Sequence, residues 1–313
     1  KKNKVFGIVL NTSDYNSLAD SCDDTPSRVI SIMGNTHCGK TFITNEIIQH
    51  NCNDQEPIYQ SNNNNAAFVP RLGAANSNRA TTSDISAYVC PYKKANDKEH
   101  NGENKQKFLI LDCEGSGAGN KPPAESTNHY AEIQKNNAHE ILNEKDYCSI
   151  RRESIGFHIP RCAYVCSDLI IFTTTQDLSE HESAQKVKEM ATRMAINGIY
   201  NAETPSLIIV CNRVLDEKVA HFSDPEFATN DFFENHDDER ELLNLYHDMK
   251  IVVLPTKSSE KWFNKQIKTL NHTIEQMLEA RMEHKQKMGT AFSRAMWATL
   301  FQQVVQGLNS NIP

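Results

Sequence analysis

A glycine-rich loop between an apolar run and a helical pattern most constrains what this chain can fold into. Residues 34–41 are Gly-Asn-Thr-His-Cys-Gly-Lys-Thr, which is the G-x-x-x-x-G-K-[ST] pattern of a phosphate-binding loop. The loop follows the β-rich run 28–33 and precedes residues 42–48, whose apolar spacing is helical. A strand, this loop and a helix in that order predict a P-loop fold that binds a nucleoside triphosphate with Mg²⁺.

Each residue type in the loop has a chemical reason. Gly34 and Gly39 permit backbone torsions that let successive N–H groups face phosphate oxygens. Lys40 supplies a cation for the outer phosphates, and Thr41 supplies a hydroxyl ligand for Mg²⁺. The predicted nucleotide-binding residues of this segment are Gly34, Asn35, Thr36, His37, Cys38, Gly39, Lys40, Thr41 and Phe42.

Apolar, β-rich runs alternate with mixed segments along the rest of the chain. This alternation predicts an α/β fold with a mostly parallel central sheet flanked by helices. The expected strands are residues 5–10, 28–33, 85–90, 107–112, 168–175, 206–211 and 250–255, and helical spacing marks residues 180–199 and 226–249. The Asn-rich segment 49–80 and the polar segment 91–106 are expected to be solvated loops.

Composition narrows the class of protein. The net charge of −7 disfavours a general nucleic-acid binder, whose surface would be basic. Nine cysteines without framework spacing favour reduced thiols and a cytoplasmic location. No apolar run approaches the roughly 20 residues that span a bilayer. Because the chain begins at Lys1 rather than Met, we expect a fragment, and a membrane anchor could lie outside it.

A second group of residues completes the predicted Mg²⁺ and γ-phosphate site. Asp112 ends an apolar strand, where a P-loop protein holds Mg²⁺ through water. Gly115 lets a backbone N–H approach the γ-phosphate closely. This Asp-x-x-Gly pattern is characteristic of GTP switch proteins. Thr82, directly before the strand expected at 85–90, is predicted to complete the Mg²⁺ shell.

These motifs together resemble the GTPase domain of the dynamin superfamily. The Asp-x-Glu-Gly form at 112–115 and Asn45 after the phosphate loop are shared with its guanylate-binding protein and atlastin branch. Residues 289–313 are similar to the first helix beyond the GTPase domain in that branch. The resemblance implies a GTPase domain over 1–285 and the start of a helical stalk over 286–313.

The resemblance also implies an activity and a partner. It implies Mg²⁺-dependent GTP hydrolysis, with GDP as product, and a homodimer formed face to face through the GTPase domains. Nucleotide-dependent pairing would drive a conformational change, and segments outside this chain could contact a membrane. The catalytic residues it implies are His37, Lys40, Thr82 and Gly115.

Three positions depart from the pattern of that branch. His37 stands where the branch usually has an Arg that stabilises charge during hydrolysis, and Ala80 stands where it often has a Ser. The base-reading segment after strand 206–211 should contain Arg-Asp, or Asn-Lys-x-Asp as in other GTPases. Here Val214 occupies the Asp position of the first pattern, and Asp216 falls one residue late for the second. The base-contacting residues predicted from this register are Asn212, Arg213 and Val214.

The C-terminal segment carries an apolar stripe at a spacing of four. Its residues are Phe292, Met296, Leu300, Val304 and Leu308. The stripe predicts a helix that packs against the GTPase core or the next stalk helix rather than one that inserts into a membrane.

Three functions remain open at this level. The first is an active dynamin-like GTPase. The second is a nucleotide-binding scaffold with little or no turnover, suggested by His37, Ala80 and the irregular base motif. The third is an ATP-dependent small-molecule kinase, which would need a lid with paired arginines, and only Arg151-Arg152 stands out as such a pair.

Overall fold

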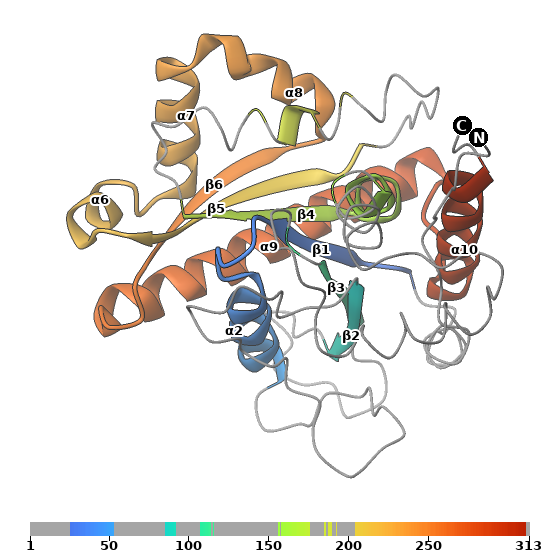
Figure 1. The fold of residues 1–313 in the computed structure, drawn as a ribbon, viewed down its shortest axis with the longest axis horizontal. Helices are drawn as coiled ribbons and strands as arrows, with labels where there is room; N and C mark the ends of the chain where they lie inside the picture. The colour runs from blue at the N-terminus through green and yellow to red at the C-terminus, as the bar shows by residue number, and fades with distance from the viewer. Residues whose placement is uncertain are drawn as a thin grey trace, which may run out of the picture.

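A six-stranded sheet organises the fold in the computed structural model, which describes residues 26–52, 85–91, 107–113, 115, 156, 158–175, 185, 187–189, 192 and 204–310. The strand order is β2-β3-β1-β4-β5-β6, and neighbours run parallel except β2 and β3 (Figure 1). The strands are β1 (Val29–Gly34), β2 (Ile85–Pro91), β3 (Lys107–Cys113), β4 (Leu169–Thr174), β5 (Ser206–Val214) and β6 (Met249–Pro255). The predicted α/β class is confirmed, with six of the expected strands. The seventh, residues 5–10, lies outside the described residues.

Helices cover both faces of this sheet. They are α2 (Lys40–Cys52), α6 (Asp216–His221), α7 (Pro225–Asn235), the 3₁₀ helix η1 (Asp237–Glu241), α8 (Leu242–Leu245), α9 (Glu260–Met288) and α10 (Arg294–Ser310), with further helical residues at 158–166. Strand β1 lies between β3 and β4 in the sheet. The chain adds strands first on the β3 side of β1 and then on the β4 side, so the order of strands reverses at the loop that follows β1. Ligands of parallel α/β sheets bind at this position, outside the carboxyl ends of the strands.

Side-chain alternation on β1 divides the core into two layers. Ile30 and Ile32 pack into a cluster with α2 and α9, whereas Val29 and Met33 pack into a second cluster with residues 158–166, α7 and α10. Every residue of β1 and of β4 is buried. A strand covered on both faces is apolar throughout, which explains why these strands were recognisable in the sequence.

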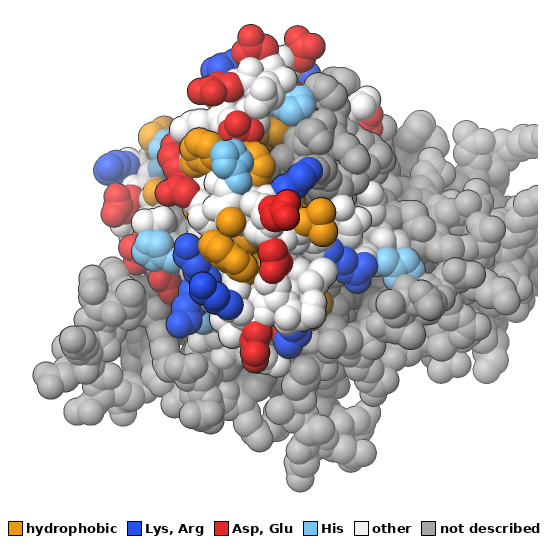
Figure 2. Space-filling view, turned by 90° about the vertical axis from the view of Figure 1, so that its left-hand side faces the viewer, with side chains coloured by type: hydrophobic (Ala, Val, Ile, Leu, Met, Phe, Trp, Pro, Cys, Tyr) orange, Lys and Arg blue, Asp and Glu red, His pale blue; other side chains and the backbone are white. Residues whose placement is uncertain are grey.

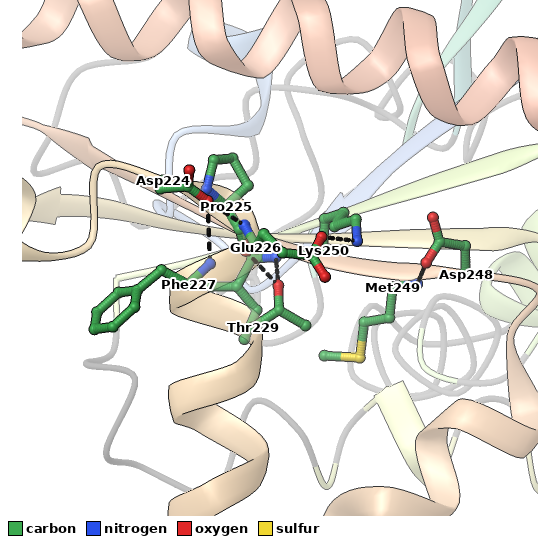
Figure 3. Close-up of polar contacts among 9 residues, drawn as sticks. Asp224, Pro225, Glu226, Phe227, Thr229, Asp248, Met249 and Lys250 are labelled. Carbon is green, nitrogen blue, oxygen red and sulfur yellow. Dashed lines mark hydrogen bonds and ion pairs between the residues drawn. The ribbon is translucent and has the colours of Figure 1, made fainter.

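Helix α7 covers the outer edge of β6 (Figure 3). The Asp224 carboxylate caps the helix by accepting hydrogen bonds from the backbone N–H groups of residues 226 and 227, at 2.8 and 3.1 Å. Thr229 Oγ1 donates to the Pro225 carbonyl at 2.6 Å and accepts from the Ile251 N–H at 2.9 Å. The Thr229 hydroxyl therefore satisfies an edge N–H that a neighbouring strand would otherwise have to pair.

The single helix expected over 226–249 is wrong. Helix α7 ends at Asn235, η1 and α8 follow as short turns, and residue 249 already belongs to β6. Asn235 Nδ2 donates to the Asp231 carbonyl at 2.8 Å, and His236 Nδ1 lies 2.9 Å from the Phe232 carbonyl. His236 has φ −139° and ψ 67°, outside the helical region, so the helix ends before it.

The C-terminal helices meet at a glycine turn. Gly289 has φ 70°, the left-handed conformation that commonly ends a helix, and Thr290 N–H bonds to the Lys285 carbonyl at 2.9 Å. Helix α10 then packs on the sheet domain, and Trp297 Nε1 donates to the Cys166 carbonyl at 2.6 Å.

The predicted apolar stripe of α10 is shifted by about one residue from the buried face, although Val304 of the stripe packs partly buried against the core. The side chain of Leu308 lies outside the described residues. The buried face consists of Trp297, Ala298, Phe301 and Val305. Of the predicted stripe, Met296 is 56 % exposed and Phe292 is 36 % exposed. Both sets repeat every four residues, so spacing alone did not distinguish them. The Trp297 ring lies in the buried face, where its Nε1 reaches the Cys166 carbonyl.

Candidate phosphate-binding site

The backbone of the 34–41 loop has the torsions that the motif predicts. Gly34 has φ 141° and Gly39 has φ 92°. A Cβ on Gly34 would lie 2.1 Å from the Thr173 carbonyl oxygen of β4, and one on Gly39 would lie 2.4 Å from Asn212 Nδ2. Both positions therefore require glycine for space as well as for torsion. His37 also adopts a left-handed φ of 66°, and its side chain is exposed.

Lys40 is a buried cation within this loop. Its side chain is 7 % exposed, and Nζ donates to the Asn35 carbonyl at 2.9 Å. Among the described residues it forms no ion pair with a carboxylate. An ammonium group removed from water without a counter-ion is unfavourable. The loop therefore presents a positive charge that an anion would stabilise.

Cys38 has a structural place in the loop. Its thiol donates to the Asn35 carbonyl at 2.8 Å, and the side chain is 2 % exposed. Burial raises the pKa of the Cys38 thiol, and the nearby Lys40 charge only partly opposes this. The thiol is therefore protonated at neutral pH and is not a nucleophile.

Thr41 and Asp112 form a set of hard oxygen ligands. Thr41 Oγ1 donates to Asp112 Oδ2 at 3.0 Å, and Asp112 is fully buried at the end of β3. Mg²⁺ in phosphate sites is held by one or two carboxylates or hydroxyls together with substrate phosphates. These two side chains fit that role. In the described part of the chain, no group of three or more His, Cys, Asp or Glu side chains is suited to a metal ion.

Gly115 lies directly against the phosphate loop. Its carbonyl accepts a hydrogen bond from Thr36 Oγ1 at 3.0 Å. A Cβ at this position would lie 2.5 Å from Lys40 Nζ and 2.7 Å from the Thr36 backbone nitrogen. Only glycine fits between these groups, so the segment after β3 lies close to the Lys40 ammonium. The predicted contact of Gly115 with a γ-phosphate stays a prediction.

Asn212 joins the end of β5 to the phosphate loop. Its side chain is buried, and Nδ2 donates to the Cys38 carbonyl at 2.9 Å. The register between β5 and β6 shifts at this point, with Asn212 opposite Leu254 and Val214 opposite Pro255. Arg213 is the additional residue, and it adopts φ 66°. This is a β-bulge, in which β5 has one residue more than the facing stretch of β6.

The bulge changes the position of Asp216 relative to Asn212. Asp216 is one residue late for Asn-x-x-Asp in the sequence, and the bulged Arg213 takes up one residue. Asp216 Oδ2 accepts a hydrogen bond from Ser259 Oγ at 2.6 Å. Asp216, the first residue of α6, and Ser259, the N-cap residue of α9, thus connect the segments that follow β5 and β6.

Ser259 is the N-cap residue of α9, yet its side chain makes no capping hydrogen bond. A Ser at this position usually accepts from a backbone N–H of the first turn, which stabilises the helix by about 1 kcal/mol. Here the hydroxyl donates to Asp216 instead. A residue that gives up a local stabilising contact to orient a carboxylate indicates a functional constraint.

The structure brings most of the predicted site residues together at one end of the sheet. They are Gly34, Asn35, Thr36, Cys38, Gly39, Lys40, Thr41, Asp112, Gly115 and Asn212. Val214 is half-buried and packs against the core, and Phe42 packs against Phe263 at 5.6 Å between ring centroids. Thr82 and Ala80 lie outside the described residues.

Sequence reasoning missed Ser259 and set Asp216 aside. The available signal was the Ser259-Glu260-Lys261 sequence directly after an expected strand and before a long helical pattern. The bulge at Arg213 had no such signal, because nothing in the residue types of 212–214 requires it.

Comparison with known proteins gives no family assignment. No family model matches the chain, and no curated protein matches it. Two solved structures are similar in part. They are the Methanosarcina barkeri Roco2 RocCORdC chain bound to GDP, with 9 % identity and TM-score 0.34, and the SRb-GTP/SRX signal recognition particle receptor complex from Chaetomium thermophilum, with 11 % identity and TM-score 0.33.

The coverage of these two neighbours differs. The first match covers 82 % of this chain and about half, 51 %, of the Roco2 chain, and the second covers 74 % of this chain and 90 % of the receptor chain. TM-scores this low do not support an inference about function. The chain's own strand order and its 34–41 loop define the class, an α/β P-loop fold of the G-domain type. No described helix is both long and apolar enough to cross a membrane.

Proposed function

We propose that this chain binds a guanine nucleotide with Mg²⁺ and hydrolyses GTP to GDP. The observation that carries the proposal is the buried Lys40 ammonium, which is paired with a carbonyl and with no carboxylate among the described residues. A Mg²⁺-bound polyphosphate supplies the missing negative charge. The left-handed glycines and the new helix α2 add N–H groups directed at the same anion.

Asp112 and Thr41 would hold Mg²⁺ in this proposal. The ion supplies charge neutralisation between the outer phosphates. Thr41 contributes its hydroxyl, and the buried Asp112 carboxylate holds the hydroxyl in place at 3.0 Å. Gly115 offers its backbone N–H at the position of the outer phosphate, next to Lys40. Thr82 remains a predicted ligand of the same ion.

Asp216 favours guanine over adenine. The guanine edge presents two donors, N1–H and the 2-amino group, and a carboxylate can accept from both. Adenine presents no such pair. Ser259 donates to one oxygen of Asp216, which fixes the orientation of the carboxylate. Asn212, at the end of the same strand, donates a hydrogen bond to the phosphate loop. The segment proposed to read the base is therefore attached to the segment proposed to hold the phosphates.

A scaffold that binds nucleotide with little turnover is the second candidate. It is favoured by the exposed His37 at the loop position where an Arg would stabilise the transition state. An arginine of that kind contributes about 10³–10⁵ in rate. The two candidates share every binding residue, so only turnover separates them.

Phosphate release from GTP and from ATP, compared between the wild type and Lys40→Ala, tests the proposal. GTP-dependent release that the substitution abolishes supports a GTPase. Tight GTP binding without release supports the scaffold. Release from ATP alone, in the presence of an acceptor, contradicts both and favours the kinase alternative.

The finer assignment to the guanylate-binding protein and atlastin branch is part of the same proposal. It includes a homodimer through the G domain, a stalk that begins within 286–313, and a cytoplasmic protein associated with a membrane through other segments. Light scattering with a non-hydrolysable GTP analogue and with GDP tests the dimer. A monomer in both states would contradict nucleotide-dependent pairing.

A further inference from the structure

The turn between β6 and α9 is attached to the helix that follows the phosphate loop. Lys257 Nζ lies 3.1 Å from Glu46 Oε1 on α2. The same ammonium lies 5.4 Å from the centroid of the Phe42 ring and 5.9 Å from that of Phe263. A single side chain therefore makes an ion pair and two cation–π contacts with α2 and the start of α9.

These contacts lie between the two halves of the proposed nucleotide site. Phe42 directly follows Thr41, the proposed Mg²⁺ ligand, and Glu46 is one helical turn further on. On the other side, the turn that carries Lys257 is closed by a hydrogen bond from the Ser259 N–H to the Thr256 carbonyl at 3.0 Å. Ser259 is the residue that orients Asp216.

We propose that Lys257 is a positioning residue for base recognition: it holds the 256–259 turn against α2 so that Ser259 keeps Asp216 at the height of the purine edge. The inference rests on the proposed function. Lys257 touches neither base nor phosphate in this account. It sets the distance between the part of the site that reads the base and the part that holds the phosphates.

The geometry separates this role from a general structural one. The Lys257 side chain is 68 % exposed, whereas the Glu46 side chain is 14 % exposed. Because the Lys257 ammonium remains open to water, this ion pair adds little to stability. Helices α2 and α9 are joined independently in the core, where Asn51 Nδ2 donates to Asn271 Oδ1 at 3.3 Å and Phe263 packs among the buried residues. Loss of Lys257 would therefore leave the fold intact and release only the 256–259 turn. This turn lies at the end of the molecule that faces the viewer in Figure 2, where basic, acidic and apolar side chains are interspersed.

The chain provides a matched control. Lys265 lies on the same helix α9, and its Nζ is 5.0 Å from the centroid of the Trp262 ring. It is an exposed lysine in a cation–π contact, as Lys257 is, but it makes no described contact with α2. Lys257→Arg is the conservative variant, since a guanidinium can keep both the ion pair and the ring contacts.

Dissociation constants of Mg·GDP and Mg·IDP, measured by calorimetry on the whole chain, test the inference. IDP lacks the 2-amino group, so the ratio of the two constants reports how well Asp216 meets that group. In Lys257→Ala we expect the preference for GDP over IDP to fall by about three- to tenfold, with the melting temperature nearly unchanged. Lys257→Arg should restore the ratio to within about twofold of the wild type, and Lys265→Ala should leave it unchanged.

A second variant keeps the test valid if Lys257→Ala folds poorly. Glu46→Gln removes the ion-pair charge with almost no change of shape and should lower the ratio in the same direction by a smaller factor. An unchanged ratio in both variants, with a wild type that binds GDP, overturns this inference alone. A wild type that binds neither nucleotide overturns the proposed function instead.

Discussion

Replacement of Asp216 by Asn should change the base preference of this chain from guanine to xanthine. The substitution keeps the size of the side chain and one acceptor oxygen. Ser259 Oγ donates to the Asp216 carboxylate at 2.6 Å and would donate to the amide oxygen of the variant. The amide NH₂ would then face the base, where the 2-amino group of guanine is a second donor and the 2-oxo group of xanthine is an acceptor.

The expected magnitude follows from the contacts that are lost. A hydrogen bond to a charged group contributes about 1.5–3 kcal/mol. Asp216 is exposed in the structure, so the lower end of that range applies to each of its two bonds with guanine. The loss is then about 3 kcal/mol, which corresponds to roughly 150-fold weaker GDP binding. Binding of XDP should become stronger in the same variant.

Calorimetric titration of Mg·GDP and Mg·XDP into the wild type and the variant measures both changes. Glu217→Gln is the matched control, because it removes one negative charge from the adjacent exposed position of the first turn of α6. We expect its GDP affinity to stay within about twofold of the wild type, because Glu217 is exposed and makes no ion pair with the residues that the structure describes. GDP binding to Asp216→Asn that is as strong as to the wild type would refute the assignment of the base-reading carboxylate.

Three further predictions follow from other contacts. Chelation of Mg²⁺ should weaken binding of a GTP analogue by about tenfold or more, and Asp112→Asn should bind equally weakly with and without the ion; an analogue that binds as well in EDTA would contradict the metal site. Lys285→Met should lower the free energy of unfolding by about 3 kcal/mol in urea, because the ion pair to the buried Asp168 is lost. A loss no larger than in the exposed control Lys287→Met would argue against this. Thr229→Val should cost about 1–3 kcal/mol and speed hydrogen exchange at the β6 edge, since the Ile251 N–H loses its acceptor; unchanged exchange would contradict that role.

The strands were predictable because burial on both faces leaves a continuous apolar sequence. β1 and β4 are buried at every position, and such runs are recognisable without any knowledge of their neighbours. The phosphate loop was predictable for a different reason. Its glycines are required by local torsion and by the close approach of neighbouring backbone. A Cβ at Gly34, for example, would lie 2.1 Å from the Thr173 carbonyl oxygen. Only glycine meets such a requirement, so the sequence itself shows it.

The parts that were not predictable depend on contacts between distant segments. Whether Met296 or Trp297 faces the core of α10 is decided by the Cys166 carbonyl and the surface of the sheet, which the spacing of apolar residues does not contain. The same holds for Asp216, the proposed base-reading residue. The position of its carboxylate depends on the bulge at Arg213 and on the hydrogen bond from Ser259, which lies 43 positions away in the sequence.

The most direct test of the central claim is calorimetry with Mg²⁺ and a non-hydrolysable GTP analogue on the wild type and on Lys40→Met. We expect the wild type to bind with a dissociation constant of about 10 μM or less, and the variant to bind about 100-fold more weakly because the phosphate anion loses the buried cation of the loop. A wild type that binds no purine triphosphate, or a variant that binds as tightly as the wild type, would contradict the claim that the 34–41 loop is a phosphate site.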